Sequence, residues 1–301
     1  MKKLIVLVAV GLSLTNGLFA QSVGKRITAE GEANYSKPTE GTLSSKLMRR
    51  GMPYHVVLPK DYSASKEKRY PVIYLLHGLF GSSANWTALT KLPVYAQSYD
   101  AIIVTPEGEN GWYTDHDSIA AKKHESYIIK ELIPEIDAKY RTISKREGRV
   151  IAGLSMGGYG ALKFAFKYPE MFILAGSFSG ALGAATYGSS PGMESIVKTI
   201  DDAMGPRGNA TRTSNDLFAM VRNASPEKIK ALPFVYLDCG TEDILFFQNN
   251  REFVALLIEK KIPHEYRELP GAHNWEYWNK QVQEFLRVAA LRLNMKPNSL
   301  L

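Results

Sequence analysis

The pattern in this sequence that most clearly could carry chemistry is a serine between glycines, Gly-Leu-Ser-Met-Gly at residues 153–157. An apolar stretch, residues 149–153, leads into it, and a helix-compatible stretch, residues 159–168, follows it. A nucleophilic serine at a strained strand-to-helix turn needs glycine neighbours, because a Cβ there would block the close backbone packing. The alternative is a tight turn with a capping serine. The position between a buried strand and a helix favours Ser155 as a nucleophile.

Two histidines follow Ser155, and one of them has the position expected of a general base. Serine is a weak nucleophile at neutral pH, so a base must lie within hydrogen-bond reach. After such a turn the usual chain order is serine, acid, histidine. His264 lies in an alternating strand, residues 263–269, where a structural or exposed imidazole is expected. His273 lies in the next loop, so we predict that it is the base, the alternative being an ordinary loop histidine.

Three acidic residues near the end of the preceding strand are candidates for the group that orients the base: Asp238, Glu242 and Asp243. Asp238 is still inside the apolar run, whereas Asp243 lies beyond the turn at Gly240, where a side chain can bend towards the histidine. We therefore predict Asp243 as the acid of a catalytic triad. The alternative is that Asp243 only caps a helix that begins near Phe246.

Acyl transfer at a serine also needs two backbone N–H groups that stabilise the charge on the carbonyl oxygen of the tetrahedral intermediate. The amide after the nucleophile, that of Met156, is the first. The second is expected in the loop after an early strand, residues 76–81, where Gly78 permits a close turn and Leu79 is the predicted donor. His77 in this loop ends a buried strand and precedes Ser155, so a structural imidazole is expected.

Aromatic residues stand near the same edge of the predicted sheet. Trp112 and Tyr113 follow the strand at residues 101–105, and together with Trp86 they could wall a pocket for an ester substrate. Packing against the core is an equally good explanation, since aromatic side chains cover loops as often as they touch ligands. The Asp-His-Asp run at residues 115–117 lacks a second cluster of ligands, so neither a metal nor another cofactor is predicted.

The elements that must position these residues form an α/β pattern. Continuous apolar runs without alternation are typical of strands buried on both faces of a parallel sheet. They occur at residues 72–76, 101–105, 149–153, 173–178 and 234–238, and a possible edge hairpin precedes them at residues 42–47 and 54–58. Helical periodicity covers residues 125–140, 249–260 and 275–293 and is weaker at 193–204 and 216–222. The alternation predicts a mostly parallel sheet with helices on both faces.

Composition favours one exported domain. The 301 residues are 45% hydrophobic, which is ample for one core. Residues 1–20 combine two lysines, an apolar run and a terminal alanine, as in a secretory signal peptide, which predicts a secreted or periplasmic protein without a membrane span in its mature form. We expect a single domain over residues 21–301, with an insertion at about 180–233. The mild positive charge is spread along the chain and predicts no nucleic-acid partner; the sequence does not indicate an oligomeric state.

Six segments make the chain similar to a known family: LLHGLFGSSANW, IIVTPEGENGWYTD, ELIPEIDAKYRT, IAGLSMGGYGALKFAFKYPEMF, LDCGTEDILFFQN and GAHNWEYWNKQVQEFL. In their order and spacing they resemble the putative-esterase family of α/β-hydrolases. That family includes tributyrin esterases, S-formylglutathione hydrolases, feruloyl and acetylxylan esterases and mycolyltransferases. The resemblance extends over most of residues 40–290 and is closest to short-chain esterases of the tributyrin type. It implies the α/β-hydrolase fold, a triad of Ser155, Asp243 and His273, and oxyanion amides from Leu79 and Met156.

These observations predict a secreted serine carboxylesterase that hydrolyses short-chain acyl esters through an acyl-serine intermediate. The expected partner is a small-molecule or carbohydrate-linked ester. An acetylxylan or feruloyl esterase that acts on plant polysaccharide is an alternative, as is an acyltransferase that passes the acyl group to a sugar hydroxyl. A non-catalytic binding protein is disfavoured, because such proteins typically lose a triad member and all three are present here.

Overall fold

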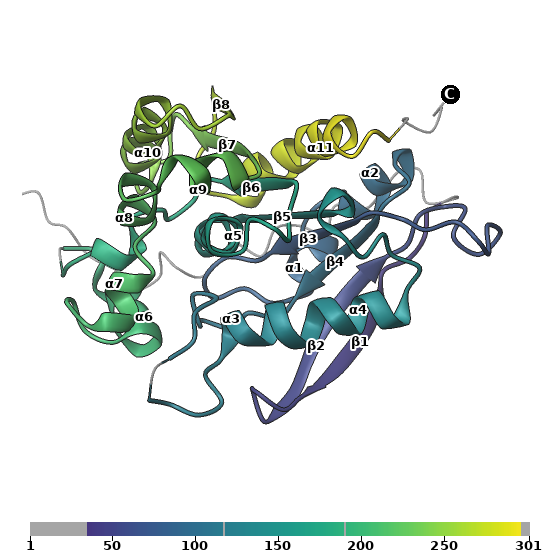
Figure 1. Ribbon diagram of the computed structural model, residues 1–301, viewed down its shortest axis with the longest axis horizontal. Helices are drawn as coiled ribbons and strands as arrows, with labels where there is room; N and C mark the ends of the chain where they lie inside the picture. The colour runs from purple at the N-terminus through teal and green to yellow at the C-terminus, as the bar shows by residue number, and fades with distance from the viewer. Residues whose placement is uncertain (1–34, 117, 190, 296–301) are drawn as a thin grey trace, which may run out of the picture.

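The central element is a mostly parallel sheet of eight strands (Figure 1). The computed structural model describes residues 35–116, 118–189 and 191–295. The strand order is β1-β2-β4-β3-β5-β6-β7-β8, and β2 pairs antiparallel with both β1 and β4, whereas the strands from β4 to β8 are parallel. The strands are β1 (Thr39–Ser45), β2 (Arg50–Val57), β3 (Val72–Leu76), β4 (Ile102–Pro106), β5 (Arg149–Leu154), β6 (Leu174–Phe178), β7 (Phe234–Gly240) and β8 (His264–Leu269).

The apolar runs of the sequence form the middle of this sheet. Every residue of β3, β4, β5 and β6 is buried, as expected of strands covered on both faces. The predicted edge hairpin is present as β1 and β2. The α/β-hydrolase architecture predicted from the sequence is therefore confirmed.

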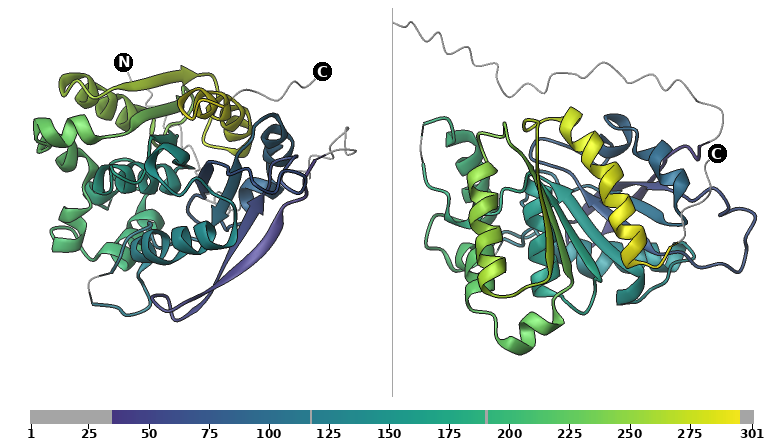
Figure 2. Two further views of the ribbon diagram at one scale, coloured as in Figure 1. Left: turned by 45° about the vertical axis from the view of Figure 1, so that its right-hand side comes forward. Right: turned by 90° about the horizontal axis from the view of Figure 1, so that it is seen from above.

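Alternate side chains of each strand enter two separate cores. On one face, Val72, Tyr74 and Leu76 of β3 pack with helices α4, α5 and α10. On the other face, Ile73 and Leu75 pack with α1, α2 and α11. The right-hand view of Figure 2 shows the strands running between α10 and α11. The covering helices are α1 (Asn85–Ala88), α2 (Leu92–Tyr95), α3 (His124–Ser126), α4 (Ile133–Lys139), α5 (Met156–Lys167), α10 (Phe247–Glu259) and α11 (Trp275–Arg292).

One predicted helix, residues 125–140, is divided in the structure. Between α3 and α4, residues Tyr127–Leu132 have the wider hydrogen bonding of a π-helix. Pro134 explains the change, because it has no N–H to donate to the carbonyl of Lys130. The wider register before it places Pro134 in the first turn of α4, where no donor is required.

The described part of residues 180–233, the predicted insertion, forms a short 3₁₀ turn and four helices between β6 and β7. The helices are α6 (Glu194–Met204), α7 (Ala210–Ser214), α8 (Leu217–Arg222) and α9 (Pro226–Ala231). The sequence indicated α6 and α8 but not α7 and α9, which are short and begin at Asn209 and Ser225 caps. A hydrogen bond of 3.0 Å from Trp112 Nε1 to Thr199 Oγ1 ties α6 to the loop after β4.

The predicted signal peptide, residues 1–20, lies outside the described residues. Within the described ranges, none of the helices combines the length and the apolar composition that a bilayer span requires. The extent of the domain, residues 21–301, stays a prediction.

Candidate active site

Ser155 occupies a strained turn between β5 and α5. Its φ is 53° and its ψ is −117°, a region that L-residues seldom adopt. The turn is held by hydrogen bonds from Ser155 N to Phe178 O, 2.9 Å, and from Ala181 N to Ser155 O, 3.1 Å. It also needs Gly157, where a Cβ would lie 2.4 Å from the Leu76 carbonyl oxygen. The glycines thus let the start of α5 pack directly on the end of β3.

The three residues predicted as a triad lie in one hydrogen-bonded line. The Ser155 hydroxyl is 3.0 Å from Nε2 of His273, and Nδ1 of His273 is 2.7 Å from Oδ2 of Asp243. A carboxylate only accepts, so Nδ1 carries the proton and Nε2 of the neutral ring is free to accept one from serine. This is the geometry that a serine, its base and an orienting acid require.

Asp243 accepts hydrogen bonds on both of its carboxylate oxygens. Its Oδ1 accepts hydrogen bonds of 3.1 Å from the amides of Leu245 and Phe246 in the turn before α10, while its Oδ2 accepts from His273. Burial alone would raise the pKa of this carboxyl, but the hydrogen bond from His273 and those two amides outweigh burial and lower the pKa of Asp243 below its ordinary value. The group is therefore an ionised, buried carboxylate.

The loops that carry the acid and the base are bound to each other. The amide of Glu242 donates to the carbonyl of Gly271, 2.9 Å, and a Cβ on Gly240 would lie 2.1 Å from that same oxygen. The imidazole of His273 is also enclosed by rings, with centroids 5.0 Å from Phe246 and 4.8 Å from Trp278. The sequence analysis did not predict these two rings as neighbours of His273. Their positions three residues after Asp243 and five residues after His273 could have indicated it.

The predicted oxyanion amides both lie beside Ser155. Met156 is the first residue of α5, where a backbone N–H has no partner within the helix. A Cβ on Gly78, next to Leu79, would be 3.4 Å from the Ser155 Cβ. Among the described residues, no acceptor binds the N–H of Leu79 or of Met156. Neither N–H is thus committed to another group of the described residues, and their role as an oxyanion hole stays a prediction.

The three aromatic residues that were predicted to wall a substrate pocket pack in the protein interior instead. Trp86, Trp112 and Tyr113 are at most 1% exposed. Trp86 donates to the Leu76 carbonyl, 3.0 Å, and Tyr113 donates to the His77 carbonyl, 3.0 Å. Because their rings fill the interior below the loops, the core-packing alternative describes them better.

His264 and His77 both lie where a structural imidazole was predicted. His264 is in β8, with Nδ1 2.7 Å from the Ile262 carbonyl, and it makes no contact with the triad. His77 is 1% exposed at the end of β3. Its two nitrogens face the Gly78 carbonyl and the Glu107 carboxylate.

The fold and this site together define a hydrolase of the α/β-hydrolase class. Residues 45–288 match the model of the family described as "Putative esterase", and the chain belongs to that family. It is accordingly a carboxylic-ester hydrolase.

Known proteins resemble the chain over most of its length. An acetyl esterase of Caldicellulosiruptor saccharolyticus is 28% identical over 248 residues, which cover 79% of this chain and 92% of that protein. A solved ferulic acid esterase is also 28% identical, with a TM-score of 0.74 over 86% of this chain and 100% of its own. FphF, a fluorophosphonate-binding serine hydrolase of Staphylococcus aureus, shares the fold at a TM-score of 0.74 and 23% identity, over 85% of this chain and 98% of its own.

Proposed function

We propose that the chain hydrolyses short-chain acyl esters, acetyl esters first among them, through an acyl intermediate on Ser155. The observation that carries the proposal is the line from the Ser155 hydroxyl through His273 to the Asp243 carboxylate. The acetyl esterase of C. saccharolyticus supports the acetyl group as the acyl part, since it matches four fifths of the chain.

The reaction follows from the positions of the protons. Nε2 of His273 takes the hydroxyl proton while Ser155 Oγ bonds to the ester carbonyl carbon, and the carbonyl oxygen becomes an oxyanion beside Leu79 and Met156. The tetrahedral intermediate then breaks its bond to the alcohol oxygen, which receives the proton from His273. Water attacks the acyl-serine by the same steps and releases the acid. Asp243 stabilises the imidazolium at each transfer without taking its proton.

A series of p-nitrophenyl esters from acetate to dodecanoate tests both parts of the proposal. We expect the highest kcat/KM on the shortest chains, and a loss of at least about 10³-fold in Ser155→Ala. Ser214→Ala removes an exposed serine in α7 and serves as the matched control, expected to keep wild-type rates. Hydrolysis that survives in Ser155→Ala would overturn the nucleophile, and a preference for long chains would overturn the substrate class.

A feruloyl ester is a second candidate substrate, favoured by the ferulic acid esterase that superposes on most of the chain. Methyl ferulate and feruloylated xylan, tested beside acetylated xylan, distinguish the two. If ferulate is released at a higher kcat/KM than acetate is, feruloyl esters are the better description of the substrate.

We also propose that the enzyme is exported, because residues 1–20 have the composition of a signal peptide. Expression of the full chain with a C-terminal tag in a bacterial host should give a processed protein outside the cytoplasm. Mass spectrometry should show an N-terminus close to Gln21, whereas an intact N-terminus on a cytoplasmic protein would contradict export.

A further inference from the structure

The peptide that joins Gly78 to Leu79 is fixed from its carbonyl side. The Gly78 oxygen is 2.7 Å from Nδ1 of His77 and accepts a hydrogen bond of 3.1 Å from the amide of Gly81. A carbonyl oxygen only accepts, so Nδ1 of His77 must carry a proton. Both contacts therefore hold the carbonyl in one direction.

The direction of the carbonyl decides the direction of the Leu79 N–H. A trans peptide is planar, and its C=O and N–H point opposite ways. With the carbonyl drawn towards His77, the N–H points away from the imidazole, and it has no acceptor among the described residues. Rotation of this one peptide would instead present an oxygen to the oxyanion, where two negative partial charges would repel.

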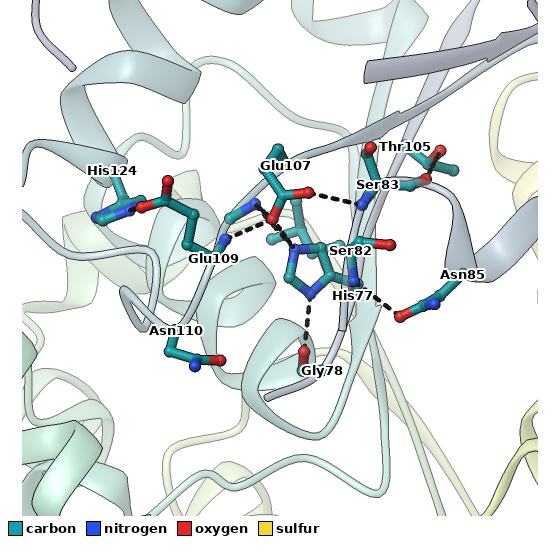
Figure 3. Close-up of polar contacts among 12 residues, drawn as sticks. His77, Gly78, Ser82, Ser83, Asn85, Thr105, Glu107, Glu109, Asn110 and His124 are labelled. Atoms are coloured by element: carbon teal, nitrogen blue, oxygen red, sulfur yellow. Dashed lines mark hydrogen bonds and ion pairs between the residues drawn. The ribbon is translucent and has the colours of Figure 1, made fainter. Parts of the chain in front are cut away.

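The imidazole that holds the carbonyl is itself held by Glu107. Nε2 of His77 is 3.1 Å from Oε1 of Glu107 and 2.9 Å from the amide of Gly108. If Nε2 is protonated it donates to the carboxylate directly. If it is not, it accepts from the amide of Gly108, which also donates to Oε1 of Glu107, 3.1 Å, so the carboxylate then acts through that amide. In either state the proton on Nδ1 remains. Figure 3 shows the ring between the Gly78 carbonyl and the Glu107 carboxylate.

The carboxylate of Glu107 connects the two loops beside the nucleophile. It accepts hydrogen bonds from the amides of Ser83, 3.0 Å, in the loop after β3, and of Glu109, 2.7 Å, in the loop after β4. Burial would raise the pKa of Glu107, but the hydrogen bond from His77 and these amides lower the pKa below its usual range. Glu107 is thus an ionised carboxylate that is fixed by backbone amides and faces the imidazole of His77.

We propose that His77 and Glu107 are positioning residues for the oxyanion hole: the carboxylate orients the imidazole, and the imidazole holds the Gly78–Leu79 peptide with its N–H turned to the substrate oxygen. The inference rests on the proposed function, since it assigns the Leu79 amide a role in ester hydrolysis. Neither side chain touches the reacting atoms. They act through the peptide.

Two replacements of His77 separate positioning from packing. In His77→Asn the side-chain amide nitrogen lies close to the place of Nδ1 and can still donate to the Gly78 carbonyl. In His77→Gln the amide reaches the place of Nε2, and the donor to that carbonyl is lost. We expect His77→Gln to lower kcat about 100-fold with KM within about threefold, because an oxyanion donor contributes 10²- to 10³-fold to kcat. His77→Asn should retain kcat within about tenfold of the wild type, which is a rescue that loss of packing alone would not produce.

Two carboxylates of one loop provide the matched pair for Glu107. Glu107→Gln removes the charge that faces His77, and we expect kcat to fall about tenfold. Glu109→Gln is the same chemical change two residues away, on a carboxylate that binds Arg50 and His124 instead, and should leave kcat within about twofold. Equal effects of the two substitutions would contradict the role of Glu107.

Crystal structures of the wild type and both His77 variants give a result that is independent of activity. The inference predicts a Leu79 N–H directed towards Ser155 in the wild type and in His77→Asn, and a rotated or disordered Gly78–Leu79 peptide in His77→Gln. An unchanged peptide in His77→Gln, or equal losses of kcat in the two variants, would overturn it. If the wild type hydrolysed no ester, the proposed function would fail, while the peptide orientation would still test this inference.

Discussion

The substitution Asp243→Asn tests how the acid fixes the proton on His273. One oxygen of Asp243 binds two amides, those of Leu245 and Phe246, and the other binds Nδ1 of His273 at 2.7 Å. An asparagine has one oxygen and one NH₂ group. The two amides can only donate, so they select the oxygen and leave the NH₂ group facing His273.

The consequence is an imidazole with its proton on the wrong nitrogen. A facing NH₂ group needs an acceptor, so Nδ1 of His273 loses its proton and Nε2 carries it. Nε2 then cannot accept the proton of Ser155. Loss of this step in a serine protease lowers kcat by about 10⁴-fold, or about 5 kcal/mol in the activation barrier, and we expect a similar loss here.

The assay is kcat on p-nitrophenyl acetate, with circular dichroism to verify that the fold is retained. Glu242→Gln is the control, because Glu242 is the adjacent acid, is exposed and also was a candidate in the sequence. It should retain wild-type kcat. A loss below about tenfold in Asp243→Asn, or an equal loss in the control, would refute the argument that Asp243 determines the protonation of His273.

Three further predictions concern buried groups. Gly157→Ala places a Cβ 2.4 Å from the Leu76 carbonyl oxygen and 2.6 Å from that of His77. Because these neighbours are backbone atoms that cannot move cheaply, urea denaturation should show a free energy of unfolding lower by about 1–3 kcal/mol. An unchanged denaturation midpoint would contradict the close packing. Lys163→Met removes the ammonium group 3.0 Å from the buried Glu125 carboxylate. We expect the free energy of unfolding to fall by about 3 kcal/mol in the same measurement. An unchanged free energy of unfolding would show that Lys167 suffices as the partner of Glu125. Asp238 is fully buried, and burial raises its pKa from 3.8 to about 8. Between these values the folded protein keeps a proton that the unfolded chain has released, so the wild type should lose stability as the pH rises through this window, and Asp238→Asn should not. The difference in free energy of unfolding between Asp238→Asn and the wild type should grow by up to about 1 kcal/mol per pH unit and level off above about pH 8. A difference that does not change with pH would refute the raised pKa of Asp238.

The sequence indicated most of the sheet because buried parallel strands have a distinctive composition. The runs at residues 72–76 and 149–153 coincide with β3 and β5 almost to the residue. The interrupted helix at residues 124–139 was not foreseen, because the effect of Pro134 depends on how the preceding turn can adjust its hydrogen bonds. Residues 210–214 and 226–231 were missed because helices this short have too few turns to show periodicity.

The chain order of Ser155, Asp243 and His273 was enough to propose the triad, whereas the aromatic residues were harder. Trp86, Trp112 and Tyr113 follow strands that end at the edge of the active site, and composition does not reveal whether such a ring points inwards or outwards. The part played by His77 was equally hidden. Its contacts with Gly78 and Glu107 depend on the path of two loops, which no local pattern specifies.

The central claim is that Ser155 receives the acyl group, and trapping of the intermediate tests it most directly. The enzyme is mixed with a slowly released acyl ester, quenched in acid within milliseconds to seconds, digested and analysed by mass spectrometry. We predict one acyl group per chain, on the peptide that contains Ser155, formed and lost at rates that match turnover. Acylation of another residue, or turnover at full rate with no acyl-enzyme and an unmodified Ser155 peptide, would contradict the account.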